Sequence, residues 1–395
     1  MSIGDPALEG VRILLLTKTD FTEPRDGGTL RLSAIAARLQ AEGAIVDAVA
    51  VKAADGWSPS AAPAPRRGHL SRAARVAART AAVASASVAR WFSLRTVRTI
   101  GGLLDRHRYD AAVVEYSQLL IYAPLLRGIP IVCDLHNIES QLLDNYAASA
   151  SSLPRRLVAR YEAARVRRLE RGMFRHVSAA TTVSGHDTEL LRALTGAGDE
   201  LVLTAPNGVS ETAFVQPKRR AEGVEVVFIA SLGWQPNVDA VEWLVGSVWP
   251  QVRAADPAAR LRIIGRSPRA SVRELDGADG VTVHADVPET WPFLSSASVA
   301  TAPLLAAGGT RLKILEALGT GTPVVATSLG ALGLEAASDQ GALTIVDSPA
   351  EFAAALLRVS ANPPADSVVR GAAGAYRWQN TLAPLVETLT RLTSR

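Results

Sequence analysis

One stretch in the second half of the chain, residues 308–333, reads GGTRLKILEALGTGTPVVATSLGALG. Its pattern predicts a loop, a short helix, a buried strand and a second loop. Gly308 and Gly309 allow the backbone to approach a ligand closely. The helix that follows presents unpaired N–H groups and a positive dipole end, where an anion can bind. The stretch therefore predicts a phosphate-binding site.

Three charged side chains belong to this stretch. Arg311 and Lys313 add positive charge to the first turn of the helix, where the dipole favours anions, so a bound phosphate would offset an unfavourable placement. Glu316 lies about one and a half turns into the helix, within reach of a neighbouring sugar hydroxyl. The alternative is an amphipathic helix capped by glycine that binds no ligand.

The composition limits the class of protein. A chain of 395 residues is expected to form two or three domains, and an apolar fraction of 48% supports well-packed cores. A net charge of +4, from 42 basic and 38 acidic residues, gives no field that would mark a nucleic-acid-binding protein. The single cysteine, Cys133, excludes a disulfide framework and a cysteine metal site, and we expect it in the core.

The sequence shows no signal segment and no apolar run of membrane-spanning length, which predicts a cytoplasmic protein. Peripheral contact with a membrane stays open because residues 52–100 form an Ala/Arg-rich segment, expected to be helical, with arginines from Arg66 to Arg98. A basic amphipathic helix can lie on anionic lipid or attract an acidic acceptor. The alternative is a solvent-exposed face in an arginine-rich chain.

The first half of the chain alternates strands and helices. An apolar run at residues 11–16 predicts a buried strand, and Asp26-Gly27-Gly28 opens a helix that leads to the next strand at residues 45–51. This order is typical of a parallel α/β sheet. The glycines do not follow the spacing G-x-G-x-x-G, which argues against a dinucleotide site. Gly27 and Gly28 are instead expected to bring the backbone close to a substrate or a phosphate.

Polar residues follow the strand predicted at residues 130–134. His136, Asn137 and Glu139 come at its carboxyl end, where ligands gather in open α/β sheets. His136 and Glu139 are therefore candidates for catalysis; the alternative for His136 is a residue that caps the following helix. The long charged helix predicted at residues 154–175, with Glu162 and Glu170, is interpreted as a solvated face.

A second alternating series of strands and helices runs from residue 224 to residue 346 and predicts a second doubly wound domain. We expect an N-terminal domain at residues 1–215, a C-terminal domain at 216–375, and at 376–395 the end of a single long helix, Ala373 to Leu392, that crosses back to the first domain. Helices are expected near residues 119–126 and 238–253.

These motifs, in this order, resemble those of retaining glycosyltransferases of family 4, which have the GT-B fold of two Rossmann-like doubly wound domains facing across a cleft. Three parts carry the resemblance: Pro206-Asn207-Gly208-Val209, the loop from Ser231 to Asn237, and GTRLKILEA at 309–317 followed by Pro323-Val324-Val325. The resemblance covers nearly the whole chain.

The resemblance implies a nucleotide sugar bound mainly by the second domain. Glu316 would hydrogen-bond the ribose, whereas the first glutamate of the family's signature is absent because Gly308 stands eight residues earlier. Trp234, Gln235 and Pro236 occupy the loop in which the family has a basic pair, so Arg311 and Lys313 would neutralise the diphosphate. Further donor contacts are expected from Gly28, Ser231, Gly233, Gly265, Arg266, Val287, Gly308, Gly309, Thr310 and Leu312.

The resemblance also implies catalytic roles. His136 would lie beside the transferred sugar, and Arg311 and Lys313 would stabilise the charge that develops on the leaving diphosphate. Gly27, Asn137 and Glu139 are expected on the acceptor side. The donor would be a UDP- or GDP-linked sugar, and the acceptor a hydroxyl of a small molecule, a glycan or a lipid-linked compound.

We expect neither a cofactor nor a metal, since no Asp-x-Asp triplet occurs in the sequence. Three other interpretations compete with a glycosyltransferase. One is a nucleotide-sugar epimerase or hydrolase on the same architecture. The second is a two-domain binding protein without catalysis, and the third is a nucleic-acid-associated protein that uses the arginine-rich segment.

Overall fold

A computed structural model describes residues 6–22, 27–52, 69–149, 152–219, 221–305 and 312–394. The chain forms two compact units: unit 1 is Met1–Pro206 with Leu382–Arg395, and unit 2 is Asn207–Thr381. The first unit thus ends after Pro206, whereas the sequence interpretation placed the boundary at residue 215. The chain returns to unit 1 at Leu382 instead of residue 376.

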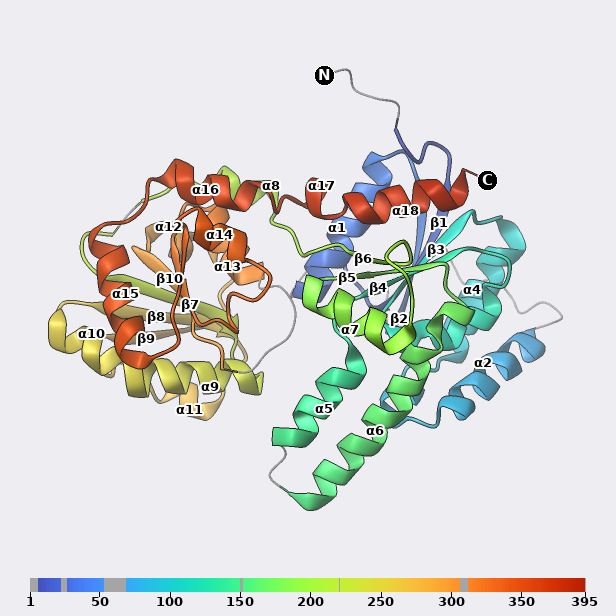
Figure 1. The fold of residues 1–395 in the computed structure, drawn as a ribbon, viewed down its shortest axis with the longest axis horizontal. Helices are drawn as coiled ribbons and strands as arrows, with labels where there is room; N and C mark the ends of the chain where they lie inside the picture. Colours follow the sequence, from blue (N-terminus) through green and yellow to red (C-terminus); the bar gives the residue numbers. More distant parts are fainter. Residues whose placement is uncertain are drawn as a thin grey trace. The chain divides into compact units, whose positions relative to one another are not determined.

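Unit 1 is built on a parallel six-stranded sheet with the order β2-β1-β3-β4-β5-β6 (Figure 1). Every residue of β3, β4 and β5 is buried. Because successive side chains of a strand point to opposite faces, this burial means that both faces of the sheet are covered. The strands are β1 Arg12–Thr19, β2 Ile45–Lys52, β3 Ala111–Glu115, β4 Ile131–Leu135, β5 Ala179–Thr182 and β6 Val202–Thr204.

Helices cover the sheet of unit 1, and Cys133 lies in the core as expected. The helix expected near residues 119–126 is a 3₁₀ helix, η1, in which Pro124 cannot donate a backbone hydrogen bond. The helices are α1 Gly27–Ala41, α2 His69–Val83, α3 Ala86–Ala89, α4 Leu94–Arg106, η1 Ser117–Leu125, α5 Glu139–Ser149, α6 Leu153–Arg171, η2 Met173–Arg175, α7 Gly185–Thr195 and α18 Ala383–Thr393.

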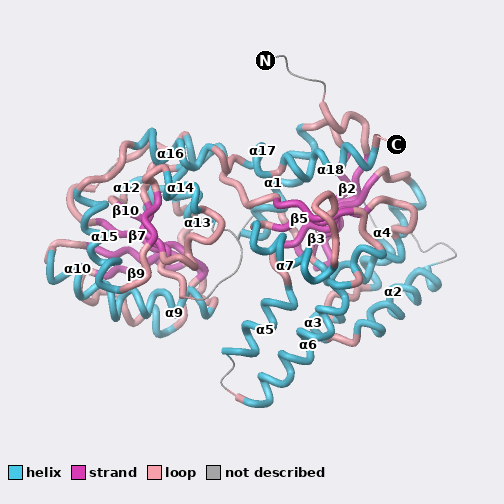
Figure 2. The backbone as a smooth tube through the Cα atoms, in the orientation of Figure 1, coloured by secondary structure: helices cyan, strands magenta, loops and turns pink. Residues whose placement is uncertain are grey.

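Unit 2 contains a second parallel six-stranded sheet, with the order β12-β11-β10-β7-β8-β9. Figure 2 shows its strands enclosed by helices. The strands are β7 Glu225–Ser231, β8 Arg260–Arg266, β9 Val281–Ala285, β10 Val299–Ala302, β11 Val324–Ala326 and β12 Leu343–Ile345. Two doubly wound parallel sheets confirm the predicted α/β fold class.

Two predicted helices are interrupted, in each case beside a proline. The helix expected at 238–253 contains a π turn, η3, just before Pro250, which cannot donate the next helical hydrogen bond. The prediction of one long helix from Ala373 to Leu392 is wrong, because this region contains the separate helices α16, α17 and α18, and Pro384 lies in the first turn of α18.

The helices of unit 2 are α8 Glu211–Phe214, α9 Gln235–Trp243, η3 Leu244–Val248, α10 Trp249–Ala255, α11 Ala270–Arg273, α12 Trp291–Ser296, α13 Leu312–Gly319, α14 Glu335–Asp339, α15 Pro349–Ala361, α16 Asp366–Gly374 and α17 Trp378–Thr381.

The strand order defines one switch point in each unit. In unit 1 the chain runs from β1 to β2 on one side and continues with β3 on the other side of β1. In unit 2 the corresponding reversal lies between β7 and β10. Ligands of doubly wound proteins bind beyond the carboxyl ends of the strands at such points. A ligand site is therefore expected at the switch point of each unit.

No helix within the described ranges is both long and apolar enough to cross a membrane.

Candidate active site

The switch point of unit 1 carries a cluster of charged side chains. Lys18 lies near the carboxyl end of β1, Glu115 is the last residue of β3, and His136 follows β4. The backbone N–H of Lys18 donates to Glu115 Oε2 at 3.0 Å. His136 Nδ1 and the hydroxyl of Tyr116 are 2.9 Å apart. The three neighbouring strands thus bring residues from separate parts of the sequence to one edge of the sheet.

The ammonium group of Lys18 is enclosed by acidic and aromatic groups. Its Nζ lies 3.5 Å from Glu139 Oε1 and 3.3 Å from the centre of the Tyr116 ring. Burial lowers the pKa of Lys18, and the charges of Glu139 and Glu115 act against this shift. The lysine is therefore a largely buried cation, 14% exposed, held between a carboxylate and an aromatic face.

Glu115 and His136 are the groups of this cluster best suited to proton exchange. Burial raises the pKa of Glu115 to about 7, against the opposing effects of His136 and Lys18. His136 Nε2 lies 3.3 Å from Glu115 Oε1 and 3.4 Å from Asp134 Oδ2, and it forms no hydrogen bond with the described residues. A carboxyl group with a pKa near neutrality beside a buried imidazole is typical of acid–base sites.

Backbone strain occurs at the same place. Tyr116 has φ 58° and ψ 146°, a conformation that a residue with a side chain rarely adopts. Its backbone N–H donates to the carbonyl of Asp134 at 2.8 Å, which holds it against β4. Strain of this kind is common at functional sites and costs on the order of 1–3 kcal/mol.

A buried ion pair lies directly beneath the cluster. Arg31, on α1, donates two hydrogen bonds to Asp134, from Nε at 2.8 Å and from Nη2 at 2.7 Å. Thr181 Oγ1 donates to Asp134 Oδ1 at 2.6 Å. Although burial opposes it, the pKa of Asp134 lies well below its usual range, because Arg31 and His136 stabilise the charged form. The pair therefore fixes the carboxylate that lies beside His136.

Glu170 shows that the interpretation of α6 as a solvated face is wrong in part. Its side chain is fully buried and accepts from the N–H groups of Glu139, at 2.9 Å, and Ser140, at 3.3 Å, and from the hydroxyl of Ser117, at 3.1 Å. Burial raises the pKa of Glu170 to about 7. The side chain therefore caps the start of α5, so the alternative that His136 caps this helix is not supported.

Unit 1 brings together some of the residues expected from the sequence. His136 and Glu139 lie in the cluster, and Asn137 is half-buried beside them in the chain. Gly27 and Gly28 are the first two residues of α1. The sequence interpretation missed Lys18, Arg31, Glu115 and Tyr116. A charged residue that directly ends a buried strand, as Glu115 does, was the available signal.

The switch point of unit 2 carries Lys313, in the first turn of α13. Its Nζ lies 3.4 Å from Asn237 Oδ1, on α9, and 4.7 Å from the centre of the Phe228 ring, on β7. Asn237 is buried, and its amide donates to the carbonyl of Ser231 at 2.8 Å. The lysine, the end of β7 and the start of α9 therefore meet at the carboxyl edge of the sheet.

Glu316 follows Lys313 by three residues and lies on the same side of α13. Its side chain is half-buried, and burial raises its pKa to about 7. Near neutral pH the carboxyl group is therefore present in both protonation states, so it can donate as well as accept a hydrogen bond.

The remaining donor-side residues of unit 2 are placed by β8 and the loops around it. Gly265 is buried, and a Cβ atom there would lie 1.8 Å from the carbonyl oxygen of Ala230, so strand packing alone requires glycine. Arg266 is exposed at the end of β8. Val287 packs against the core of unit 2. The other members of the predicted set are Ser231 at the end of β7, Gly233 in the following loop and Leu312 at the start of α13.

Four residues of the predicted phosphate site, Gly308, Gly309, Thr310 and Arg311, lie outside the described residues. Within the described ranges, no group of three or more His, Cys, Asp or Glu side chains is arranged as a metal site.

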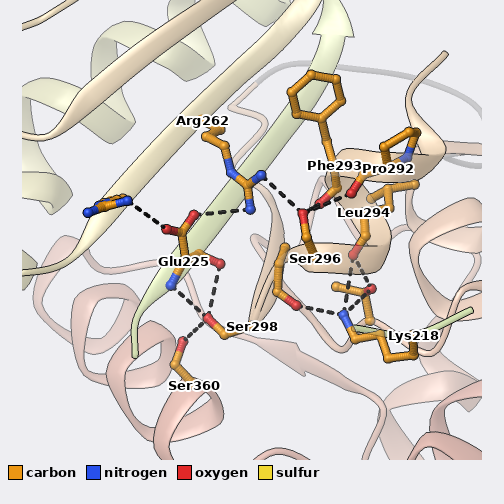
Figure 3. A network of polar contacts seen from close by, with 12 residues as sticks. Lys218, Glu225, Arg262, Pro292, Phe293, Leu294, Ser296, Ser298 and Ser360 are labelled. Carbon is orange, nitrogen blue, oxygen red and sulfur yellow. Dashed lines mark hydrogen bonds and ion pairs between the residues drawn. The ribbon is translucent and has the colours of Figure 1, made fainter. Parts of the chain in front are cut away.

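A polar network at the amino ends of the strands of unit 2 contrasts with this site (Figure 3). Glu225, at the start of β7, pairs with Arg262 at 3.0 Å, and its backbone N–H donates to Ser298 Oγ at 2.9 Å. Lys218 Nζ donates to the carbonyl oxygens of Leu294, at 3.2 Å, and Ala297, at 2.6 Å. These contacts join the strands to the segments before them and hold the sheet together.

Comparisons with known proteins identify the class to which these two units belong. Residues 26–208 match the family model described as Glycosyl transferase 4-like domain, and residues 223–362 match the model described as Glycosyl transferases group 1. Together the two models cover both units. The chain therefore belongs to the glycosyltransferases with the GT-B fold.

Solved structures show the same fold. Sucrose-phosphate synthase from Thermosynechococcus elongatus is similar with a TM-score of 0.69 and 16% identity over 97% of this chain and 99% of that chain. HepE from Anabaena in complex with UDP has a TM-score of 0.59 and 15% identity, over 96% and 100% of the two chains. TarM is longer: the match covers 75% of this chain and 59% of TarM, with a TM-score of 0.56 and 12% identity. No curated protein sequence matches the chain.

Proposed function

We propose that this protein transfers a sugar from a UDP- or GDP-linked donor to a hydroxyl acceptor, with retention of configuration and without a metal. The observation that carries the proposal is the position of Lys313, which lies in the first turn of α13 at the switch point of unit 2. A cation beside a helix N-terminus suits a diphosphate, because the helix dipole and the ammonium group both attract negative charge.

The chemistry follows from where charge develops. When the bond between the sugar and the diphosphate breaks, negative charge grows on the leaving group and the sugar acquires oxocarbenium character. A fixed cation beside the leaving group attracts the transition state, with its developing negative charge, more strongly than it attracts the ground state. This difference lowers the barrier. Glu316, whose pKa is raised to about 7, is suited to hydrogen-bond the ribose hydroxyls of the donor.

In unit 1, Glu115 and His136 are the groups that would exchange a proton with the acceptor hydroxyl, because burial raises the pKa of Glu115 to about 7 and His136 Nε2 lies 3.3 Å from its carboxyl group. Glu139 would position the ammonium group of Lys18, which it contacts. Retention is proposed from the family resemblance. Independence of a metal is proposed because the sequence contains no Asp-x-Asp triplet. The UDP complex of HepE makes UDP-sugars the first donors to test.

Thermal unfolding with a panel of UDP- and GDP-sugars tests donor binding. A ligand at 100 times its dissociation constant stabilises the protein by about 2.7 kcal/mol, which is a measurable shift. Transfer to a panel of acceptors is then read by mass spectrometry, with and without a chelator. The anomeric configuration of the product is read by NMR. Inverted configuration or loss of activity with the chelator would each contradict one part of the proposal.

Lys313→Ala tests the leaving-group role, and removal of such a group costs about 10²-fold or more in rate. Arg260→Ala is the matched control, because Arg260 is an exposed cation at the start of β8, at the opposite end of the same sheet. We expect loss of turnover only in the first variant, with similar unfolding of both. Consumption of the donor without an acceptor would favour an epimerase or hydrolase, and binding without consumption would favour a binding protein.

A further inference from the structure

Positive charge is concentrated in one part of unit 1. Residues 56–104 contain eight arginines and no aspartate or glutamate. The rest of the chain then holds 34 basic and 38 acidic residues, which is a net negative balance. Two of the eight arginines serve the fold, since Arg72 pairs with Asp105 at 2.7 Å and Arg79 Nε donates to the carbonyl of Leu120 at 2.8 Å. Arg75, Arg90, Arg95 and Arg98 are exposed.

Exposed apolar side chains gather on the neighbouring pair of helices, α5 and α6. Of the large hydrophobic residues that are exposed within the described ranges, six belong to these helices: Leu142, Tyr146, Leu153, Leu157, Val158 and Tyr161. Leu153 and Leu157 are 66% and 56% exposed. In Figure 1, α5 and α6 extend from the sheet of unit 1 as an antiparallel pair. A cluster of this kind on one pair of helices points to an interaction surface.

The exposed residues of α6 form a continuous stripe. The α6 stripe consists of Leu153, Leu157, Arg160, Tyr161, Ala164 and Arg168, all exposed. Their spacing of three or four residues keeps them on one side of the helix. The buried residues Ala159 and Ala163 follow Leu157 and Tyr161 by two positions, or about 200° around the axis, and face the protein. The stripe therefore combines apolar and cationic groups that are exposed on one side of α6.

The α6 stripe is continuous with the basic segment. The hydroxyl of Tyr161 donates to the carbonyl of Ala84 at 3.1 Å, and Arg165 Nε donates to the carbonyl of Val83 at 2.7 Å. Beside this junction lies a groove of about 430 Å³ lined mainly by small side chains. Its lining residues are Ala77, Thr80, Ala81, Ala84, Ser85, Ala86, Ala89 and Phe92.

The acidic residues of α5 and α6 lie outside the α6 stripe. Glu162 is held by the hydroxyl of Ser85 at 2.6 Å and by the N–H of Ser87 at 2.9 Å. Asp144 pairs with Arg167. Glu139 pairs with Lys18, and Glu170 is buried. The exposed side of α6 therefore presents arginines, aliphatic groups and an aromatic ring, without a free carboxylate among the residues of the stripe.

We propose that the α6 stripe and the groove beside it dock on the surface of an anionic lipid bilayer. Lipid phosphates would pair with the arginines, and the aliphatic and tyrosine side chains would enter the interface between headgroups and acyl chains. A second copy of this chain would place arginines against arginines. A nucleic acid would account for the arginines but not for Leu153 and Leu157. The proposal does not depend on the identity of the donor or acceptor.

Sedimentation of the full chain with vesicles tests the proposal. Vesicles of phosphatidylcholine alone are compared with vesicles that contain phosphatidylglycerol. We expect binding to the anionic vesicles only, with a partition coefficient that falls as salt is raised. Equal binding to both kinds of vesicle, or binding to neither, would overturn the proposal.

Two variants and their controls locate the surface. Arg160→Glu/Arg168→Glu should lower partitioning by at least about 30-fold, since the loss of each basic residue near an anionic membrane costs roughly a factor of five and the new carboxylates add repulsion. Arg219→Glu/Arg358→Glu makes the same change of charge at exposed positions of unit 2 and should have a much smaller effect. Leu153→Ser/Leu157→Ser should also weaken binding, whereas Leu329→Ser/Val368→Ser, on unit 2, should not. Equal losses in variants and controls would contradict the assignment, as would a change in oligomeric state caused by the leucine substitutions.

Discussion

Replacing Arg31 by methionine tests whether the cluster of unit 1 depends on its buried ion pair. Arg31 and Asp134 are 0% and 1% exposed, and two hydrogen bonds join them. Removal of one partner leaves an uncompensated buried charge and costs about 3–5 kcal/mol of unfolding free energy. Because Asp134 also lies 3.4 Å from His136 Nε2, we expect sugar transfer to fall as well.

The pH dependence of the unfolding free energy should also differ between the wild type and Arg31→Met. In the wild type the pKa of Asp134 is lowered, so its stabilising effect is present above the unfolded pKa of about 3.9 and is lost as the pH falls. In Arg31→Met, burial without the guanidinium would raise this pKa instead. The variant should then be most stable below about pH 4 and lose stability as the pH rises, which is the opposite trend for this group.

Urea unfolding followed by circular dichroism measures the loss, and hydrogen exchange assigns it to unit 1. The double variant Arg31→Met/Asp134→Leu should recover most of the stability, because no buried charge remains. It would leave the hydroxyl of Thr181 without its acceptor, at a cost of about 1 kcal/mol. A loss below about 1 kcal/mol in the single variant, or a double variant no better than the single one, would refute the reasoning.

Three further predictions concern both units. Because the pKa of Glu115 is raised from 4.5 to about 7, its contribution to stability is full below pH 4.5 and falls by about 3 kcal/mol as the pH rises to 7. Glu115→Gln should flatten this part of the unfolding profile, and an unchanged profile would contradict the assignment. Lys18→Met should lower transfer about tenfold or more, and it should also lower the unfolding temperature, because the largely buried carboxylate of Glu139 loses its partner. Gly265→Ala should destabilise unit 2 by about 1–3 kcal/mol in urea, because its Cβ would meet the carbonyl of Ala230. Gly371→Ala, in α16 with nothing within 4 Å, is the control and should be neutral or stabilising.

The fold could be predicted from the sequence because parallel strands buried on both faces appear as short apolar runs. The runs at residues 111–114, 130–134 and 324–326 each correspond to a strand of the structure. Helix boundaries were less certain. Pro250 and Pro384 were visible signals, but the apolar pattern on either side of each proline continues, so the pattern alone suggested single helices.

The buried charges could not be predicted in the same way. Arg31 is separated from Asp134 by 103 residues, and it lies between Leu30 and Leu32 on an amphipathic helix, where an arginine is expected to face solvent. Glu170 lies in a run of charged residues that gives no sign of its burial. Its partners belong to the start of α5 and to η1. A local pattern cannot encode contacts that only the topology of the sheet creates.

The placement of the polar groups argues for function at the carboxyl edges of the two sheets. At the amino edge of unit 2, partly exposed groups such as Glu225 and Arg262 join strands at little cost. At the carboxyl edge of unit 1, Glu115 is buried with its pKa raised to about 7, and Lys18 is largely buried with its pKa lowered. Apolar residues of similar size would stabilise the sheet at least as well. The presence of such groups at the switch point, beside the strained backbone of Tyr116, is therefore explained by catalysis better than by stability.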